Sequence, residues 1–178
     1  MTIATYSELV TELEAYLKRT DYTARIPTFI ALAEAKLNRL LDDPAMDVVA
    51  TFATATIVLP SDFKRAVSVS SDNGTALVYS VIGANMFIGP DTFSGSGTLV
   101  YSRRLPALTA GAPTNWLLTR APDIYLWGTL MQANIFGWDD ERVPGFQSLF
   151  DEAIGDMRHE SQNRRWGGSP LAPRIMRT

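Results

Sequence analysis

Histidine-based catalysis or zinc binding in this chain would have to use His159, its one histidine. His159 opens the stretch HESQN (159–163), which begins like the helical zinc-protease motif with two histidine ligands four residues apart. Asn163 stands in place of the second ligand. A lone histidine near a helix C-terminus is more simply explained as a cation at the negative end of the helix dipole. The sequence therefore gives no support to a zinc site.

The stretch GSGTLV (95–100) resembles the start of a dinucleotide-binding fingerprint. Val100 replaces the third glycine, and the residues that follow are patterned as a strand. A phosphate site of this type needs the N-terminus of a helix at that point. We therefore interpret the two glycines as part of a hairpin.

Paired carboxylates are a further route to acid–base chemistry. Glu152 and Asp156 are four residues apart on one face of a predicted helix, where we expect them to be solvated. A hydrolase built on such carboxylates stays open as an alternative. No nucleophile-elbow pattern occurs in the sequence. We expect a protein that is not an enzyme and binds no cofactor or metal.

Composition sets further bounds on function. The 178 residues are 46% hydrophobic and 20% charged, which is typical of one soluble globular domain. Cysteine is absent, so disulfides and thiolate metal sites are excluded. The net charge of −3 gives the whole chain no basic field for nucleic acid. The first residues are polar and acidic, unlike a signal peptide, and the longest apolar run, near 124–131, is shorter than the roughly 20 residues of a membrane span.

The first part of the chain is patterned as two helices and then as strands. A helix is predicted for 5–18, where Thr5 and Glu8 fit a capping box, and a second for about 23–41, with Pro27 in its first turn. Alternating β-branched residues then predict strands at 50–60, 65–71, 76–82, 85–89 and 97–105. They form a small antiparallel lobe over about 47–105.

The second part returns to helices. Asn115 can cap a short turn through 120, Pro122 starts a helix that ends near 136, and a last helix covers about 143–164. The helix 122–136 is apolar nearly all round, so we expect it to be buried on several sides. The predicted core residues are Phe29, Leu37, Trp127, Leu130, Met131, Phe150 and Ile154.

These elements predict an α+β fold that is mainly α. We expect a four-helix bundle of two helices and two helices, with the small antiparallel β lobe inserted between the pairs. Residues 1–165 would form a single domain, with helices at about 5–41 and 115–164. Residues 166–178 would form an extended C-terminal tail.

The tail combines apolar residues with arginines on a segment that two prolines and two glycines prevent from being a helix. Disordered ends are normally poor in Trp, Ile and Met, so a segment that binds a partner groove competes with a simply disordered end. The residues singled out for binding are Arg164, Arg165, Trp166, Leu171, Pro173, Arg174, Ile175, Met176 and Arg177.

Several blocks of the sequence are distinctive, namely RIPTFIALAEAKLNRLL (25–41), LPSDF (59–63), PTNWLLTRAPDIYLWGTLMQA (113–133), DDER (139–142) and RRWGGSPLAPR (164–174). Together they resemble the head-to-tail adaptor proteins of tailed bacteriophages. The blocks lie in the family's order and cover both helical pairs and the tail. They are packing motifs rather than catalytic ones.

The resemblance implies a structural virion protein in the neck of the phage, assembled in the host cytoplasm. Such adaptors form a ring, usually of twelve subunits, beneath the portal protein, and the ring extends the DNA channel. The implied partners are the portal, on which the C-terminal segment docks, neighbouring copies, and the next tail component, which is a nozzle, stopper or tail tube. DNA would pass through the lumen without specific binding. The alternative from another class is a small nucleic-acid-binding or packaging factor that uses the arginine-rich tail.

Overall fold

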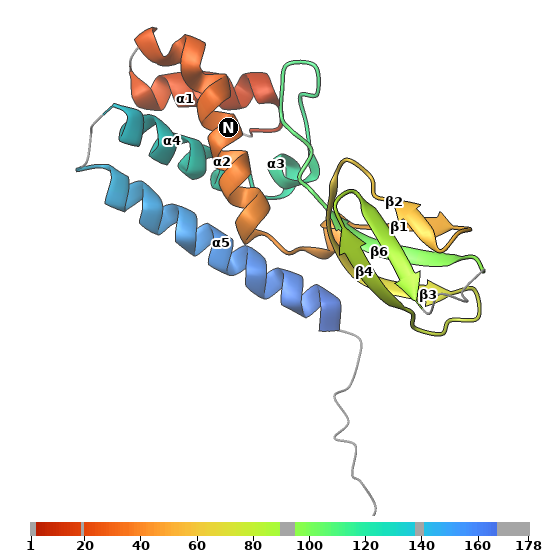
Figure 1. Cartoon of the computed structure of the whole chain (residues 1–178). Coiled ribbons are helices and arrows are strands. Elements are labelled where there is room, and N and C mark those ends of the chain that lie inside the picture. The colour runs from red at the N-terminus through yellow and green to blue at the C-terminus, as the bar shows by residue number, and fades with distance from the viewer. Residues whose placement is uncertain (1–2, 19, 90–94, 138–140, 167–178) are drawn as a thin grey trace, which may run out of the picture.

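The computed structural model describes residues 3–18, 20–89, 95–137 and 141–166. A helical part and a β part lie side by side and are joined where the first helices end and the last strand returns (Figure 1). No helix in these ranges is long and apolar enough to cross a membrane.

The N-terminal helices begin at residues that the sequence marks. Helix α1 (Tyr6–Leu17) follows the capping box of Thr5 and Glu8, and Lys18 ends it in the left-handed conformation with φ 51°. A 3-10 helix, η1 (Thr20–Arg25), precedes α2 (Ile26–Leu40). The helix predicted from residue 23 therefore starts at Ile26, because a proline at its second position is compatible only with the first turn. A short 3-10 helix, η2 (Pro44–Met46), leads into the strands.

The β part contains two three-stranded antiparallel sheets among the described residues. The predicted strand at 50–60 is two strands joined by a turn. One sheet has the order β1-β6-β3 and the other β2-β5-β4. The strands are β1 (Asp47–Phe52), β2 (Thr56–Val58), β3 (Phe63–Ser71), β4 (Val78–Ile82), β5 (Asn85–Gly89) and β6 (Gly97–Arg103).

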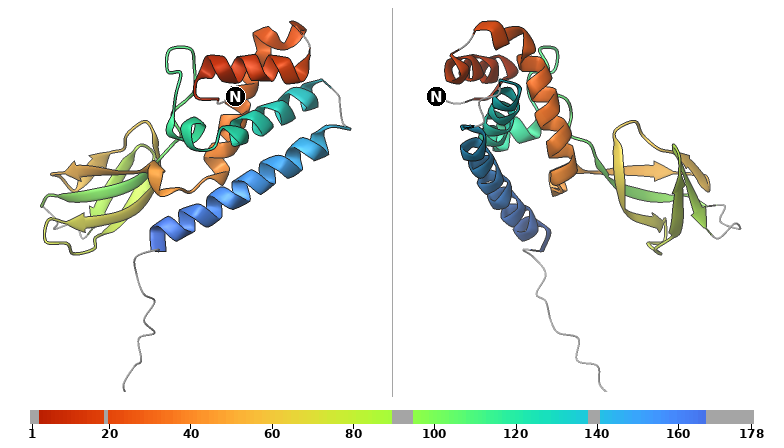
Figure 2. Two further views of the ribbon diagram at one scale, coloured as in Figure 1. Left: turned by 180° about the vertical axis from the view of Figure 1, so that it is seen from behind. Right: turned by 60° about the vertical axis from the view of Figure 1, so that its left-hand side comes forward.

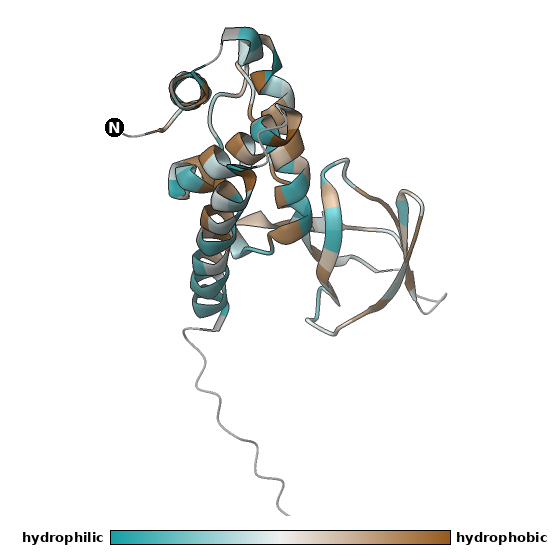
Figure 3. Cartoon of the chain, turned by 90° about the vertical axis from the view of Figure 1, so that its left-hand side faces the viewer, coloured by the Kyte–Doolittle hydropathy of each residue, from teal (hydrophilic) through white to brown (hydrophobic). Residues whose placement is uncertain are grey.

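The chain returns from β6 to three more helices. The short α3 (Trp116–Arg120) is capped by Asn115, α4 (Pro122–Phe136) follows directly, and α5 (Val143–Trp166) is the longest helix. The sequence predicts that the last helix ends near residue 164, and α5 in fact continues two residues further, to Trp166. Toward its C-terminal end α5 becomes largely hydrophilic (Figure 3).

The predicted four-helix bundle is wrong. The described residues contain five α-helices and the two sheets, and α4 packs against each of α1, α2, α3 and α5. A four-helix bundle instead sets each helix beside two neighbours around a shared core. Because α4 is apolar nearly all round, it occupies the centre itself and the other helices cover it.

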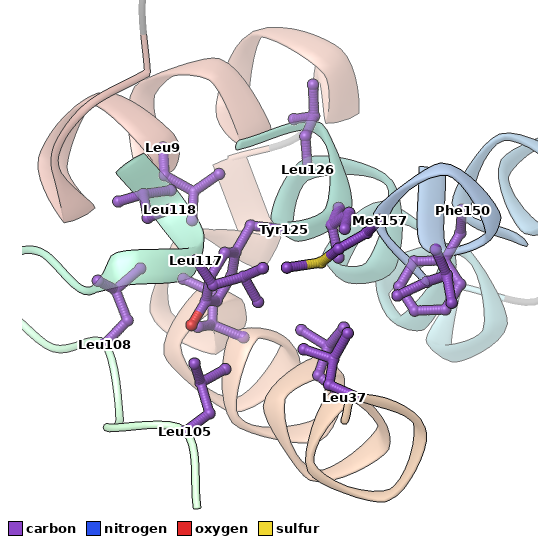
Figure 4. Close-up of a cluster of buried hydrophobic side chains, with 14 of the residues drawn as sticks. Leu9, Leu37, Leu105, Leu108, Leu117, Leu118, Tyr125, Leu126, Phe150 and Met157 are labelled. Atoms are coloured by element: carbon purple, nitrogen blue, oxygen red, sulfur yellow. The ribbon is translucent and has the colours of Figure 1, made fainter. Parts of the chain in front are cut away.

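The interior is divided between the two parts. The helical core gathers around Tyr125 of α4, with Leu117 of α3, Leu37 of α2 and Phe150 of α5 among its buried side chains (Figure 4). A separate cluster fills the β part, where Phe52, Val69, Met86, Ile88, Leu99 and Tyr101 are buried. The boundary between the two cores is polar.

Candidate functional site

The polar boundary is a network of charged side chains that we call the carboxylate junction. It lies where the C-terminal ends of α2, α3 and α5 meet the first strand and β3. Its members are Asp42, Asp43, Asp47, Arg65, Arg120, Glu160, Ser161, Arg164 and Arg165.

Asp43 is the buried centre of the carboxylate junction, with 1% of its surface exposed. One carboxylate oxygen accepts a hydrogen bond from the Ala45 N–H at 2.8 Å and so caps η2. The other accepts from Arg120 Nη1 at 2.8 Å and from the Ser161 hydroxyl. Burial acts to raise the pKa of Asp43, but the hydrogen bonds from Ser161, Ala45 and Arg120 outweigh it and lower the pKa below its ordinary value.

Arg120 extends the network from α3 to α5. Its Nε donates to Glu160 Oε2 at 3.2 Å, while Nη1 remains on Asp43. Glu160 also forms an ion pair with Arg164 at 3.0 Å, one helical turn further along. The hydrogen bond from Arg120 is the main reason that the pKa of Glu160 is lowered. One guanidinium therefore ties η2, α3 and α5 together.

Arg165 attaches the last turn of α5 to the β part. Its Nη2 lies 2.9 Å from Asp42 Oδ1 and 3.4 Å from Asp47 Oδ2. Arg65 of β3 reaches the same Asp42 oxygen at 2.5 Å. The two arginines overcome the effect of burial and lower the pKa of Asp42, whereas burial raises the pKa of Asp47. The point where the C-terminal segment leaves α5 is thus fixed against both parts of the molecule.

The structure places the predicted tail residues in two groups. Arg164 and Arg165 belong to α5 and hold ion pairs within the chain, and Trp166 is the last residue of that helix. The other predicted tail residues lie outside the described residues, and their role in binding a partner stays a prediction. They are Leu171, Pro173, Arg174, Ile175, Met176 and Arg177.

Six of the seven predicted core residues lie in the interior, namely Phe29, Leu37, Leu130, Met131, Phe150 and Ile154. The seventh, Trp127, is partly buried and stacks on Phe146 of α5 with 6.0 Å between ring centroids.

A buried polar cluster beside Tyr125 was not predicted. Glu34 of α2 is 7% exposed, and its Oε1 accepts hydrogen bonds from the Leu108 N–H at 2.7 Å and the Tyr125 hydroxyl at 2.9 Å. Asn115 donates to the same hydroxyl at 2.6 Å. Burial raises the pKa of Glu34, although the hydrogen bonds from the Leu108 N–H and the Tyr125 hydroxyl act to lower it. The signal in the sequence is an acid within the apolar stripe of a helix, between Ala33 and Leu37.

The residues considered for catalysis do not converge. His159, Glu152 and Asp156 are all exposed on α5, and Gly97 begins strand β6 rather than a phosphate-binding helix. Over the described ranges, no group of three or more acidic or histidine side chains is placed to hold a metal ion.

The described surface also carries an apolar groove and an exposed apolar sheet face. A groove of about 240 Å³ between α2 and α4 is lined by Phe29, Leu32, Ile135 and Phe136, with Arg25 at its rim. The outer face of the second sheet exposes Val58, Val78 and Ile82. Thr28 and Gln132 complete the lining of the groove.

A family model described as SU10 adaptor protein matches residues 4–86 and 77–174. The chain belongs to the SU10 adaptor protein family. This confirms the predicted membership of the head-to-tail adaptors of tailed phages. The matched ranges include every member of the carboxylate junction of this adaptor and reach into its C-terminal segment. A comparison with curated proteins gave no match.

Proposed function

We propose that this adaptor forms a ring, of twelve copies, beneath the portal in the neck of the virion. The ring joins the head to the tail, extends the DNA channel and offers a platform to the next tail component. The observation that carries the proposal is the family match, which covers both the helical and the β parts. Assembly takes place in the host cytoplasm, and the role is structural rather than enzymatic.

The C-terminal segment is the proposed portal contact. Its apolar residues and its remaining arginines, Arg174 and Arg177, suit a groove on a partner protein. The carboxylate junction supports this role, because it holds the last turn of α5 by Arg165 and so gives the segment a defined starting point. A fixed origin lowers the entropy that is lost when the segment docks.

The charge of the chain suits a channel through which DNA moves. Each copy carries −3, so a ring of copies is strongly acidic. Tight binding to the DNA backbone needs clustered lysines and arginines. Two arginines that a nucleic-acid-binding tail would use, Arg164 and Arg165, are already paired with acids. The structure thus favours passage of DNA over its retention.

The test is a mixing experiment with the portal protein from the same genome. Size exclusion with light scattering would compare the full-length adaptor with a chain that ends at Trp166. We expect the full-length adaptor to join the portal in a complex of defined mass and the truncated chain to remain free. If neither chain binds the portal while the full-length chain retains DNA, the nucleic-acid-binding alternative replaces the proposal.

A further inference from the structure

Helix α2 presents a basic and apolar outer face. Leu32 and Arg39 of α2 are seven residues apart, so they lie along one side of the helix, and Arg25, the N-cap residue of α2, precedes Leu32 by the same spacing. Leu32 is 49% exposed, and both arginines are exposed. The one acid of this helix, Glu34, is buried on the opposite side, so the outer face carries positive charge only.

The groove between α2 and α4 lies beside this face. Ile135 and Phe136 of α4 are 52% and 46% exposed there, which is unusual for large apolar side chains on a soluble surface. The guanidinium carbon of Arg25 is 4.9 Å from the centroid of the Phe136 ring and borders the groove with positive charge. The groove therefore suits an apolar side chain, and Arg39, two turns further along α2, suits an acid.

Helix α5 carries such a combination on its own outer face. Leu149 is 41% exposed, and Glu152 and Asp156 are exposed three and seven residues later, along the same side. In the described part of the chain, the side chain of neither acid has a hydrogen bond or an ion pair. The same holds for Arg39 of α2.

The two outer faces cannot meet within one molecule. Arg158 of α5 faces α2, where it donates to the Leu40 carbonyl at 3.2 Å. Asp156 and Leu149 lie about 160° and 180° around the helix from Arg158, given 100° per residue, and so point away from α2. The views in Figure 2 agree, because α2 lies on one side of the layer formed by α1, α4 and α5. A contact between these faces must join two copies.

We propose that the outer face of α5 in one copy binds the outer face of α2 in the next, with Leu149 in the α2–α4 groove and Asp156 beside Arg39. Leu32 and Arg39 have the same seven-residue spacing as Leu149 and Asp156, so both pairs align when the helices run in the same sense. The contact joins two different surfaces of identical chains, and such head-to-tail contacts close into rings when the rotation permits. The inference rests on the ring proposed above and names its contact surface.

Disulfide cross-linking gives the sharpest test, because the chain contains no cysteine. The double variant Leu32→Cys/Leu149→Cys would be oxidised, alone at high concentration and again with the portal, and run on a non-reducing gel. We expect a ladder of covalent oligomers from the double variant, and at most dimers from either single variant. The matched control is Leu32→Cys/Val78→Cys, which moves the second cysteine to exposed β4; it should give no ladder.

A charge exchange provides the second measurement. Arg39→Glu and Asp156→Arg should each weaken self-association about 10-fold by placing like charges together, and the double variant should restore it. Light scattering over a concentration series would measure the association. If the double variant is as weak as either single variant, the pairing of these two residues is wrong.

The outcomes separate this inference from the proposed function. Portal binding without a ladder, or a ladder only from the Val78 control, overturns the α2–α5 contact and leaves the portal role standing. A ladder without portal binding supports the contact and removes the portal from the proposal. A chain that neither binds the portal nor self-associates overturns both.

Discussion

At the scale of single residues, Asp43 is the most highly connected member of the carboxylate junction, because it accepts hydrogen bonds from Ala45, Arg120 and Ser161. We predict that Asp43→Ala lowers the free energy of unfolding by about 3 kcal/mol, because it leaves the Arg120 charge without its buried partner and η2 without its cap. Urea denaturation of the free chain would measure the change. Asp151→Ala, which removes an exposed acid from α5, should stay within about 0.5 kcal/mol, and an equal loss in both variants would contradict the role of Asp43.

We predict that Glu34 and Asp43 change the stability of the folded chain with pH in opposite directions. The folded-state pKa of Glu34 is raised, so the folded chain takes up this proton before the unfolded chain does. Stability from this group is therefore present at low pH and lost as pH rises through the raised pKa. For Asp43, whose pKa is lowered, stability is present above the ordinary pKa and lost as pH falls.

The measurement is the unfolding free energy of the chain and of Glu34→Gln between pH 7 and pH 4.5. The variant cannot titrate at this position, and its amide oxygen still accepts the Leu108 and Tyr125 hydrogen bonds. We expect the unmodified chain to gain stability relative to Glu34→Gln as pH falls. A constant difference over this range would show that Glu34 is not perturbed.

Neither residue could be assigned its role from the sequence. The run Asp42–Asp43–Pro44 predicts the end of a helix, and it does end α2. The partners that give Asp43 its burial, Arg120 and Ser161, are 77 and 118 residues away along the chain. Local patterns carry no information about pairs at that separation.

At the scale of elements, Gly128 sets the distance between the central helix and its neighbours. A Cβ at this position would lie 2.9 Å from Phe150 Cε2 of α5 and 3.6 Å from Ala33 Cβ of α2. We predict that Gly128→Ala destabilises the chain by about 1 kcal/mol, although alanine is the better helix former, because the buried Phe150 ring must shift. Thermal unfolding would measure the effect.

Gly155 of α5 is the matched control. A Cβ there meets nothing within 4 Å, so Gly155→Ala should raise stability by about 1 kcal/mol through helix propensity alone. The double variant Gly128→Ala/Phe150→Leu should lose less stability than the sum of the two single losses, since leucine leaves room for the added methyl group beside α4. Stabilisation by both alanine substitutions would contradict close packing at Gly128.

The elements themselves were largely accessible from the sequence, whereas their packing was not. Caps and prolines predicted the starts of α1, α3 and α4, because those signals are local. The arrangement of helices was mispredicted as a bundle. The apolar circumference of α4 already indicated a central helix, but periodicity does not say which helices cover it.

At the scale of the whole molecule, two separate cores meet at a charged boundary. The chain enters the β part through β1 and leaves it through β6. These two strands pair with each other, and Asp47 lies opposite Ser102. Residues paired in this way have Cα atoms about 5 Å apart, so the β part is attached through adjacent ends. The helical core draws no buried side chain from between Asp47 and Arg103.

We therefore predict that the helical part folds without the β part. In the test variant, a Gly-Ser-Gly linker replaces residues 48–101, which keeps Asp47 for Arg165 but removes Arg65 from the carboxylate junction. Circular dichroism should show retained helix and one cooperative thermal transition, at a lower midpoint because Asp42 has lost one of its two arginines. The control inserts the same linker after Gly83, in the turn between β4 and β5, where both cores stay intact. If the variant lacks a cooperative transition, the helical core depends on the β part. The charged boundary would then couple the folding of the two cores.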